Sequence, residues 1–239
     1  MGRIFEKRKA RMFARWSKTS KAFTKVGKEI AIAVKLGGPD PAGNPRLRMA
    51  MQTARSLNMP KDRILSAISR ANSKDAASLE EINYEAYGPY GVALFIETAT
   101  DNPTRTVANV RSILNKNGGS IGSVGCLEYL FERKGVFTIT PPEGDIEELE
   151  LELIDFGLED MFETEEGLLL FSSFSQFGAL QKALEERKIE VKSASSQRIP
   201  LTHAQITPEQ EEEVLELIES LDEDDDVQHV YHNMPASSD

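Results

Sequence analysis

Basic side chains near the beginning of the chain are the residues whose types and spacing most clearly suggest chemistry. Residues 7–28 contain nine Lys or Arg and no Asp or Glu, although the whole chain has a net charge of −11. Clustered cations neutralise phosphates and release their counterions, and about 6–10 such contacts give strong, salt-sensitive binding. We therefore expect this segment to bind a polyanion. The candidate nucleic-acid-binding residues are Lys7, Arg8, Lys9, Arg11, Arg15, Lys18, Lys21, Lys25, Lys28, Arg46, Arg48, Lys61 and Arg63.

The charge is divided unevenly along the chain. Residues 1–75 contain 18 Lys or Arg and 5 Asp or Glu, a net charge of +13, whereas residues 76–239 contain 10 and 34, a net charge of −24. Such a division indicates two functional surfaces. We expect the acidic part to repel the polyanion, which confines contact to the basic part. We also expect it to engage a protein partner or to shape the cleft between domains.

Three uses of the basic segment are open on its composition. It could contact nucleic acid, lie on an anionic membrane surface, or form a solvated helix face. The apolar residues of the segment are needed to pack a helical domain, which favours nucleic acid over membrane. No zinc-finger, RRM or KH signature is present, so sequence-specific readout of bases is not evident.

Other motifs do not predict catalysis or a cofactor. The glycine-rich residues 118–125 lack the spacing of a dinucleotide-binding or P-loop motif, and we expect a turn there. The single Cys126 excludes an intramolecular disulfide and is typical of a reducing, cytoplasmic protein. No apolar stretch approaches the roughly 18 residues of a membrane-spanning helix. We expect a protein that is not an enzyme.

Two groups of residues contain side chains of the types that bind metal ions. His229 and His232 are three positions apart in a predicted strand, so their side chains should point to opposite faces. The acidic residues 222–226 alternate as in a calcium loop, but Val227 and Asn233 stand where an EF-hand needs Gly and Glu. We therefore predict a solvated acidic turn and no metal.

Helical periodicity places the cations on a structural helix over residues 5–35. Apolar residues recur there at spacings of 3, 4 and 7, and most cations fall on the opposite face. A loop should follow at residues 37–45, then a second helix capped by Asn44 and a third that begins at Pro60. The apolar face of the first helix comprises Met12, Trp16, Phe23, Val26, Ile30 and Val34. The inward residues of the third are Ile64, Leu65 and Ile68, with Arg63 and Arg70 outward.

The rest of the chain has an α+β pattern. Strands are predicted at residues 91–98, 127–131 and 135–139, and the order between 135 and 199 is β-α-β-β-α-β, the ferredoxin-like arrangement. The last helix and strand, residues 207–231, cannot bury their apolar faces alone, so we expect them to join residues 80–131.

We therefore predict an α+β fold with a helical N-terminal domain and two ferredoxin-like α/β sandwich domains, one inserted in the other. A tandem arrangement without insertion is the alternative. The predicted domains are residues 1–75, residues 80–132 plus 203–234, and residues 133–202.

Seven segments along the chain form recognisable motifs: KLGGPDPAGNPRLR (35–48), NMPKD (58–62), YEAYGPYGV (84–92), TDNPTRT (100–106), KNGG (116–119), YLFERKG (129–135) and DDDVQHVY (224–231). Together they resemble the motifs of the YebC/PmpR family, and the resemblance covers nearly the whole chain. It implies a cytoplasmic, non-enzymatic protein of three domains, and the family includes probable transcriptional regulators and the mitochondrial translational activator of cytochrome c oxidase. Tyr90 departs from the family, since glycine is common at that position.

The first functional hypothesis is a DNA-binding transcriptional regulator. The alternative is a ribosome-associated translation factor that binds ribosomal RNA. Both are open at this point, because phosphate contacts position a protein without identifying the polymer.

Overall fold

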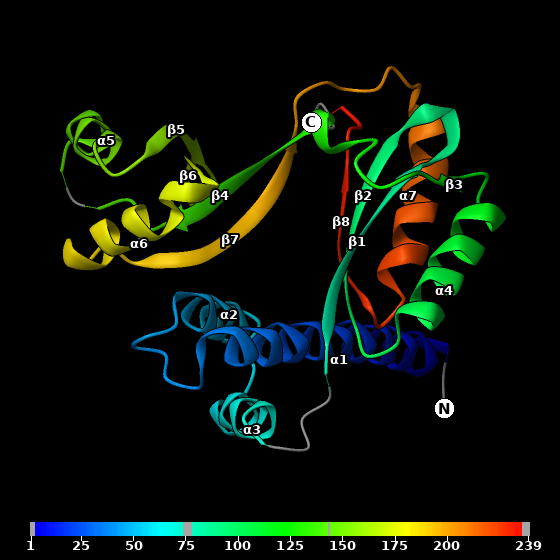
Figure 1. Ribbon diagram of the computed structural model, residues 1–239, viewed down its shortest axis with the longest axis horizontal. Coiled ribbons are helices and arrows are strands. Elements are labelled where there is room, and N and C mark those ends of the chain that lie inside the picture. Colours follow the sequence, from blue (N-terminus) through cyan, green and yellow to red (C-terminus); the bar gives the residue numbers. More distant parts are fainter. Residues whose placement is uncertain (1–2, 74–77, 143, 236–239) are drawn as a thin grey trace. The chain divides into compact units, whose positions relative to one another are not determined.

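The computed structural model of the chain describes residues 3–73, 78–142 and 144–235, with side chains from residue 19 onward. Within these ranges the chain forms seven α-helices and two four-stranded sheets (Figure 1). No helix in the described part is long and apolar enough to cross a membrane. Contacts between residues divide the chain into two compact units. The first is Met1–Asn83, Ile96–Lys116 and Leu215–Val230, and the second is Tyr84–Phe95, Asn117–Val214 and Tyr231–Asp239.

Three helices, α1 (Arg3–Gly37), α2 (Pro45–Ser56) and α3 (Lys61–Ala71), pack around one apolar core in the first unit. Val26, Ile30 and Val34 are buried there, as their spacing predicts. Phe23 is only half-buried. Met12 and Trp16 lie outside the residues whose side chains are described.

One inward residue of α3 was predicted wrongly. Leu65 is 50% exposed, whereas Ile64 and Ala67 are buried, and Ile68 packs against the core. Positions 64, 67, 68 and 71 form one stripe of a 3.6-residue helix, and position 65 lies about 100° away from position 64. Arg63 and Arg70 are exposed, as predicted.

Asn44 joins the end of α1 to the start of α2. Its side-chain oxygen accepts a hydrogen bond from the backbone N–H of Leu47 at 3.0 Å, which caps α2 as predicted. Its amide nitrogen donates to the carbonyls of Ala33 at 2.7 Å and Gly38 at 2.8 Å. A Cβ at Gly37 would lie 2.7 Å from Cγ of Asn44, so this approach needs glycine. The side chain of Asn44 therefore links both ends of the glycine- and proline-rich loop by hydrogen bonds.

Replacing Asn44 with Ala is expected to lower the free energy of unfolding by about 2–3 kcal/mol. The variant loses the helix cap, worth about 1 kcal/mol, and leaves two backbone carbonyls without their amide donor. Urea-induced unfolding followed by circular dichroism measures the change. Asn115→Ala, at an exposed position of another helix, is the matched control and should change the midpoint little.

The first sheet has the strand order β3-β1-β2-β8. It contains β1 (Glu80–Tyr87), β2 (Ala93–Thr100), β3 (Ser120–Ile121) and β8 (Val227–His232), and its helices in the chain order are α4 (Pro103–Lys116) and α7 (Pro208–Asp222). The last strand thus shares a sheet with residues 80–100, as predicted. The element order is β-β-α-β followed by α-β, so the ferredoxin-like order predicted for this part is corrected. The missed strand β1 accounts for the difference.

The second sheet lies wholly in the second unit and has the order β5-β6-β4-β7, with antiparallel neighbours. The chain order is β4 (Phe131–Ile139), α5 (Ile146–Ile154), β5 (Leu158–Thr164), β6 (Gly167–Ser173), α6 (Phe177–Glu186) and β7 (Val191–Pro200). This is the β-α-β-β-α-β order predicted from the sequence. Phe137 of β4 stacks on Phe177 of α6 at 4.5 Å, which packs this helix on the sheet.

The strand predicted at residues 127–131 is instead a 3-10 turn, η2 (Glu128–Leu130), before β4. Leu127 and Phe131 are buried with Ala93 and Phe95, so the apolar run reflects packing of a turn. The backbone N–H groups of Gly125 and Leu127 donate to the carboxylate of Glu85 on β1. This carboxylate holds the residues between α4 and β4 in a turn.

Tyr90 adopts a left-handed backbone conformation with φ of 61°. Such a conformation is strained for a residue with a side chain, which explains why glycine suits this position. The hydroxyl of Tyr90 donates to Oε2 of Glu213 at 2.6 Å, and this hydrogen bond raises the pKa of Tyr90. The side chain thus supplies a contact that glycine would lack.

Candidate nucleic-acid interface

Three predicted phosphate-binding residues of α1 form one row along the helix. Lys21, Lys25 and Lys28 are four and three positions apart, so they lie on the same side. Each contacts a carboxylate of residues 222–226, which we call the acidic turn. The prediction of a solvated turn holds for Asp222, Glu223 and Asp225, which are exposed, but it is wrong for Asp226, which is buried. The pairs are Lys21–Glu223 at 3.7 Å, Lys25–Asp222 at 3.2 Å and Lys28–Asp226 at 2.7 Å.

Asp226 is the buried centre of these contacts. Its Oδ1 accepts from Nζ of Lys28, and its Oδ2 accepts from Arg105 at 2.7 Å and from the hydroxyl of Thr106 at 2.9 Å. Burial alone raises the pKa of Asp226, but the hydrogen bonds from Lys28, Arg105 and Thr106 lower it to about 2. Asp226 is therefore an ionised structural carboxylate that ties α1, α4 and the start of β8 together.

Lys28 also has backbone partners at this point. Its Nζ donates to the carbonyls of Asp225 at 2.7 Å and Ala99 at 2.9 Å. Three donors on one ammonium group are thus occupied by the fold. The geometry gives Lys28 a structural role in addition to any contact with a ligand.

The predicted arginines of α2 are also held by other parts of the chain. Arg46 donates to Glu81 at 2.9 Å and to Glu29 at 3.3 Å. Burial lowers the pKa of Arg46, but the contacts with Glu81 and Glu29 outweigh it and raise the pKa. Arg48 donates to the carbonyls of Pro41 at 2.9 Å and Ala42 at 3.1 Å, and so braces the loop before α2.

Six further candidates lie outside the residues whose side chains are described, and their contact with nucleic acid stays a prediction. They are Lys7, Arg8, Lys9, Arg11, Arg15 and Lys18.

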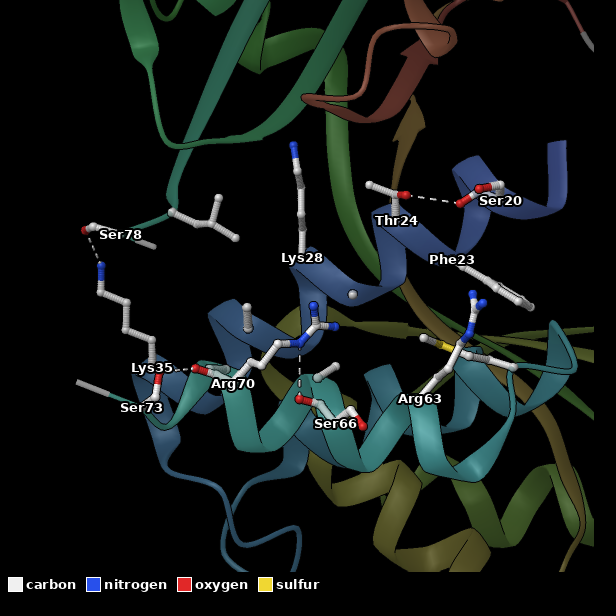
Figure 2. Close-up of a pocket in the computed structure, with 16 residues that line it drawn as sticks. Ser20, Phe23, Thr24, Lys28, Lys35, Arg63, Ser66, Arg70, Ser73 and Ser78 are labelled. Atoms are coloured by element: carbon white, nitrogen blue, oxygen red, sulfur yellow. Dashed lines mark hydrogen bonds between the residues drawn. The ribbon is translucent and has the colours of Figure 1, made fainter. Parts of the chain in front are cut away.

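The exposed candidates Lys61 and Arg63 begin α3, and Arg63 lines a groove between α1 and α3. The groove has a volume of about 910 Å³, and Figure 2 shows the side chains around it. Small residues, Gly27 and Ala31 of α1 with Ala67 of α3, leave room between the helices. The polar lining residues are Ser20, Thr24, Lys28, Lys35, Arg63, Ser66, Arg70, Ser73 and Ser78.

Several contacts within the groove set the positions of its cations. The guanidinium of Arg63 lies 5.9 Å from the ring centroid of Phe23, a cation–π distance. Nε of Arg70 donates to the carbonyl of Ser66 at 3.4 Å, and Nζ of Lys35 donates to the hydroxyl of Ser78 at 2.9 Å (Figure 2). Arg63 and Arg70 are seven residues apart, so they project from the same side of α3. The groove therefore presents fixed cations together with hydroxyls.

Two groove cations, Lys35 and Arg70, are not among the candidate binding residues chosen from the sequence, although Arg70 is predicted to face outward from the third helix. Each follows another groove cation by seven residues, Lys28 and Arg63 respectively. This heptad spacing was the available signal, because residues seven apart lie two turns along one helix face.

Known proteins and family models match this chain over nearly its whole length. Residues 3–74 match the family model described as TACO1/YebC protein N-terminal domain, and residues 79–234 match that described as TACO1/YebC second and third domain. A protein of Parabacteroides distasonis is 55% identical over 98% of this chain and 97% of its own length. One of Anaeromyxobacter dehalogenans is 53% identical over 98% of this chain and all of its own. Both are named as probable transcriptional regulatory proteins.

A solved structure is similar as well. The crystal structure of a conserved hypothetical protein from Aquifex aeolicus has a TM-score of 0.80 and 36% sequence identity. The match covers 92% of this chain and 91% of the other. The resemblance predicted from the motifs is confirmed, and the chain belongs to the TACO1/YebC family.

Proposed function

We propose that this protein is a transcriptional regulator that binds DNA through the groove between α1 and α3. It would act by binding, not by catalysis. The names of its relatives support a regulatory role, since both Parabacteroides distasonis and Anaeromyxobacter dehalogenans proteins are named probable transcriptional regulatory proteins. The groove supports nucleic acid as the partner.

The observation that carries the proposal is the composition of the groove. Its described lining includes four Lys or Arg and five Ser or Thr, and it includes no Asp or Glu. The chain as a whole has 39 Asp or Glu and 28 Lys or Arg, so such a surface departs sharply from its average. Arginine, lysine and hydroxyl groups are the side chains that most often bind phosphate oxygens of DNA. A phosphate backbone is the polyanion that fits this lining.

The proposed binding is to the backbone of DNA and not to base edges. Phosphate contacts fix the position of a protein on the duplex, whereas sequence is read in the grooves. We therefore expect steep dependence on salt and weak discrimination between sequences.

The remaining acidic part is proposed to bind a protein partner and to contain an inserted domain, residues 133–202. Strand order supports the insertion, because β8 pairs beside β2 while β4 to β7 form their own sheet.

Charge reversal in the groove tests the proposed function. The double substitution Arg63→Glu/Arg70→Glu in the full chain should weaken binding to a mixed-sequence duplex on the order of 100-fold, and should reduce the salt slope by about 2. Both side chains are exposed, so the fold should persist, which circular dichroism checks. Fluorescence anisotropy over a salt series measures the affinity.

Lys182→Glu/Lys188→Glu is the matched control, since both lysines are exposed and lie in the second unit. It changes the net charge equally and should affect binding much less. Equal losses in the two variants would contradict binding at the groove. Co-sedimentation of the wild type with ribosomes at physiological salt, without affinity for duplex DNA, would replace DNA by ribosomal RNA.

A further inference from the structure

We infer that the acidic turn competes with nucleic acid for the lysine row of α1 and thereby limits binding at the groove. The inference rests on the proposed function and concerns how nucleic-acid binding at the same groove is regulated. Lys21, Lys25 and Lys28 form the lysine row, and the acidic turn is residues 222–226.

The lysine row borders the groove. Lys28 belongs to both, because it lines the groove and pairs with Asp226. In Figure 2 the side chain of Lys28 extends away from α3, whereas Arg63 and Arg70 rise from α3 itself. Lys25 and Lys21 continue the row about one and two turns before Lys28, respectively. A polyanion in the groove therefore meets the lysine row at its rim, where the carboxylates are already bound.

The inner ion pair differs from the two outer ones in burial. The side chains of Lys28 and Asp226 are 17% and 7% exposed, so this pair is part of the fold. Lys25 and Asp222 are 22% and 51% exposed, and Lys21 and Glu223 are 35% and 77% exposed. Exposed pairs are weak and are screened by salt. A phosphate can therefore displace Asp222 and Glu223 from their lysines without opening the buried pair.

The turn does not depend on the outer pairs for its position. Asp224 accepts hydrogen bonds from Asn109 of α4 at 3.0 Å and from the backbone N–H of Asp226 at 2.9 Å. Asp226 is fixed by Lys28 and Arg105. Neutralising Asp222 and Glu223 should thus free two lysines while the fold is kept.

The test compares Asp222→Asn/Glu223→Gln with the wild-type full chain on the same duplex DNA. With two lysines released, affinity should rise on the order of tenfold at low salt, and the salt slope should become steeper by up to about 2. Glu216→Gln/Glu219→Gln is the matched control, because it removes two exposed carboxylates from the same helix, α7. This control should raise the affinity for DNA much less, since it reduces the negative charge of the protein but releases neither Lys21 nor Lys25.

A double-mutant cycle with Lys21→Gln/Lys25→Gln separates the effect of the ion pairs from the effect of the overall negative charge of the acidic turn. In the wild type these lysines are already paired, so their loss should change affinity little. In the Asp222→Asn/Glu223→Gln background their loss should remove the gain. Equal gains in the two carboxylate variants, or none, would overturn the inference. The proposed function would still stand if Arg63→Glu/Arg70→Glu weakened binding on the order of 100-fold. Failure of the wild type and every variant to bind DNA would overturn both.

Discussion

Replacing Asp226 with Asn should lower the free energy of unfolding at pH 7 by about 3–5 kcal/mol, the usual effect of removing one partner from a buried ion pair. Lys28 and Arg105 would keep their charges but lose the carboxylate between them. The amide could accept on one side only, and its NH₂ group would face other donors. Urea-induced unfolding at pH 7 measures the loss.

The same carboxylate should make stability depend on pH. The pKa of Asp226 is about 2 in the folded chain and about 3.8 unperturbed, so the ionised form is favoured by folding. The resulting stabilisation, about 2 kcal/mol, is fully present above pH 3.8 and is lost as the pH falls toward 2. The difference in the free energy of unfolding between wild type and Asp226→Asn should therefore stay constant down to about pH 4 and narrow as the pH falls from there toward 2.

Asp225→Asn is the control for both measurements. Asp225 precedes Asp226 and changes the charge equally, but its side chain is exposed and its structural contact with Lys28 uses the backbone carbonyl. The free energy of unfolding of this variant should stay within about 0.5 kcal/mol of the wild-type value at each pH. If both variants lost the same stability, the buried network would not be the cause.

Much of the fold could be predicted from the sequence because its helices have long apolar stripes and clear ends. Apolar residues at helical spacing predict helices at residues 103–117, 146–156 and 207–221, and α4, α5 and α7 begin and end within two residues of these limits. Residues 160–165 and 168–171 are predicted to form a hairpin across the Glu166-Gly167 turn, and β5 and β6 form this hairpin. Local patterns of this kind involve neighbours in the chain, which the sequence displays directly.

The errors arose where a residue serves a distant part of the chain. Strand β1 was missed because it is rich in glutamate, yet one of those, Glu85, is buried. Residues 127–131 look like a strand because three of them, Leu127, Leu130 and Phe131, are apolar. They form a turn instead, because the carboxylate of Glu85 accepts a hydrogen bond from the backbone of Leu127. Pairing across the fold, not local propensity, decided both segments.

The candidate site shows the same limit. Basic composition correctly located cations on α1 to α3, but it could not reveal which of them the fold uses. Lys25 and Asp222 are 197 positions apart, so no local pattern connects them. Arg63 and Arg70 remain exposed in the groove, and their spacing of seven residues was visible in the sequence. The sequence therefore shows which segments are basic, but only the tertiary structure shows which cations are free to bind a ligand.

Glu85→Ala should lower the free energy of unfolding by about 3–5 kcal/mol, since hydrogen bonds to a charged group contribute about 1.5–3 kcal/mol each. The carboxylate accepts from the backbone N–H of Gly125 at 2.6 Å and from that of Leu127. Alanine would leave both N–H groups without an acceptor, and Leu127 is fully buried, so water can replace the carboxylate only if the turn opens. Urea unfolding gives the loss, and faster hydrogen exchange at residues 122–127 should locate it.

Two further variants decide whether the hydrogen bonds are responsible. Glu85→Gln keeps the size of the side chain and one acceptor oxygen, so its loss should be about half that of alanine. Glu80→Ala removes an exposed glutamate from the same strand, β1, and should change stability by less than about 0.5 kcal/mol. If Glu85→Gln were as damaging as alanine, negative charge would be the essential property. If Glu80→Ala matched Glu85→Ala, the propensity of the strand would explain the loss, and the turn would owe its shape to something other than Glu85.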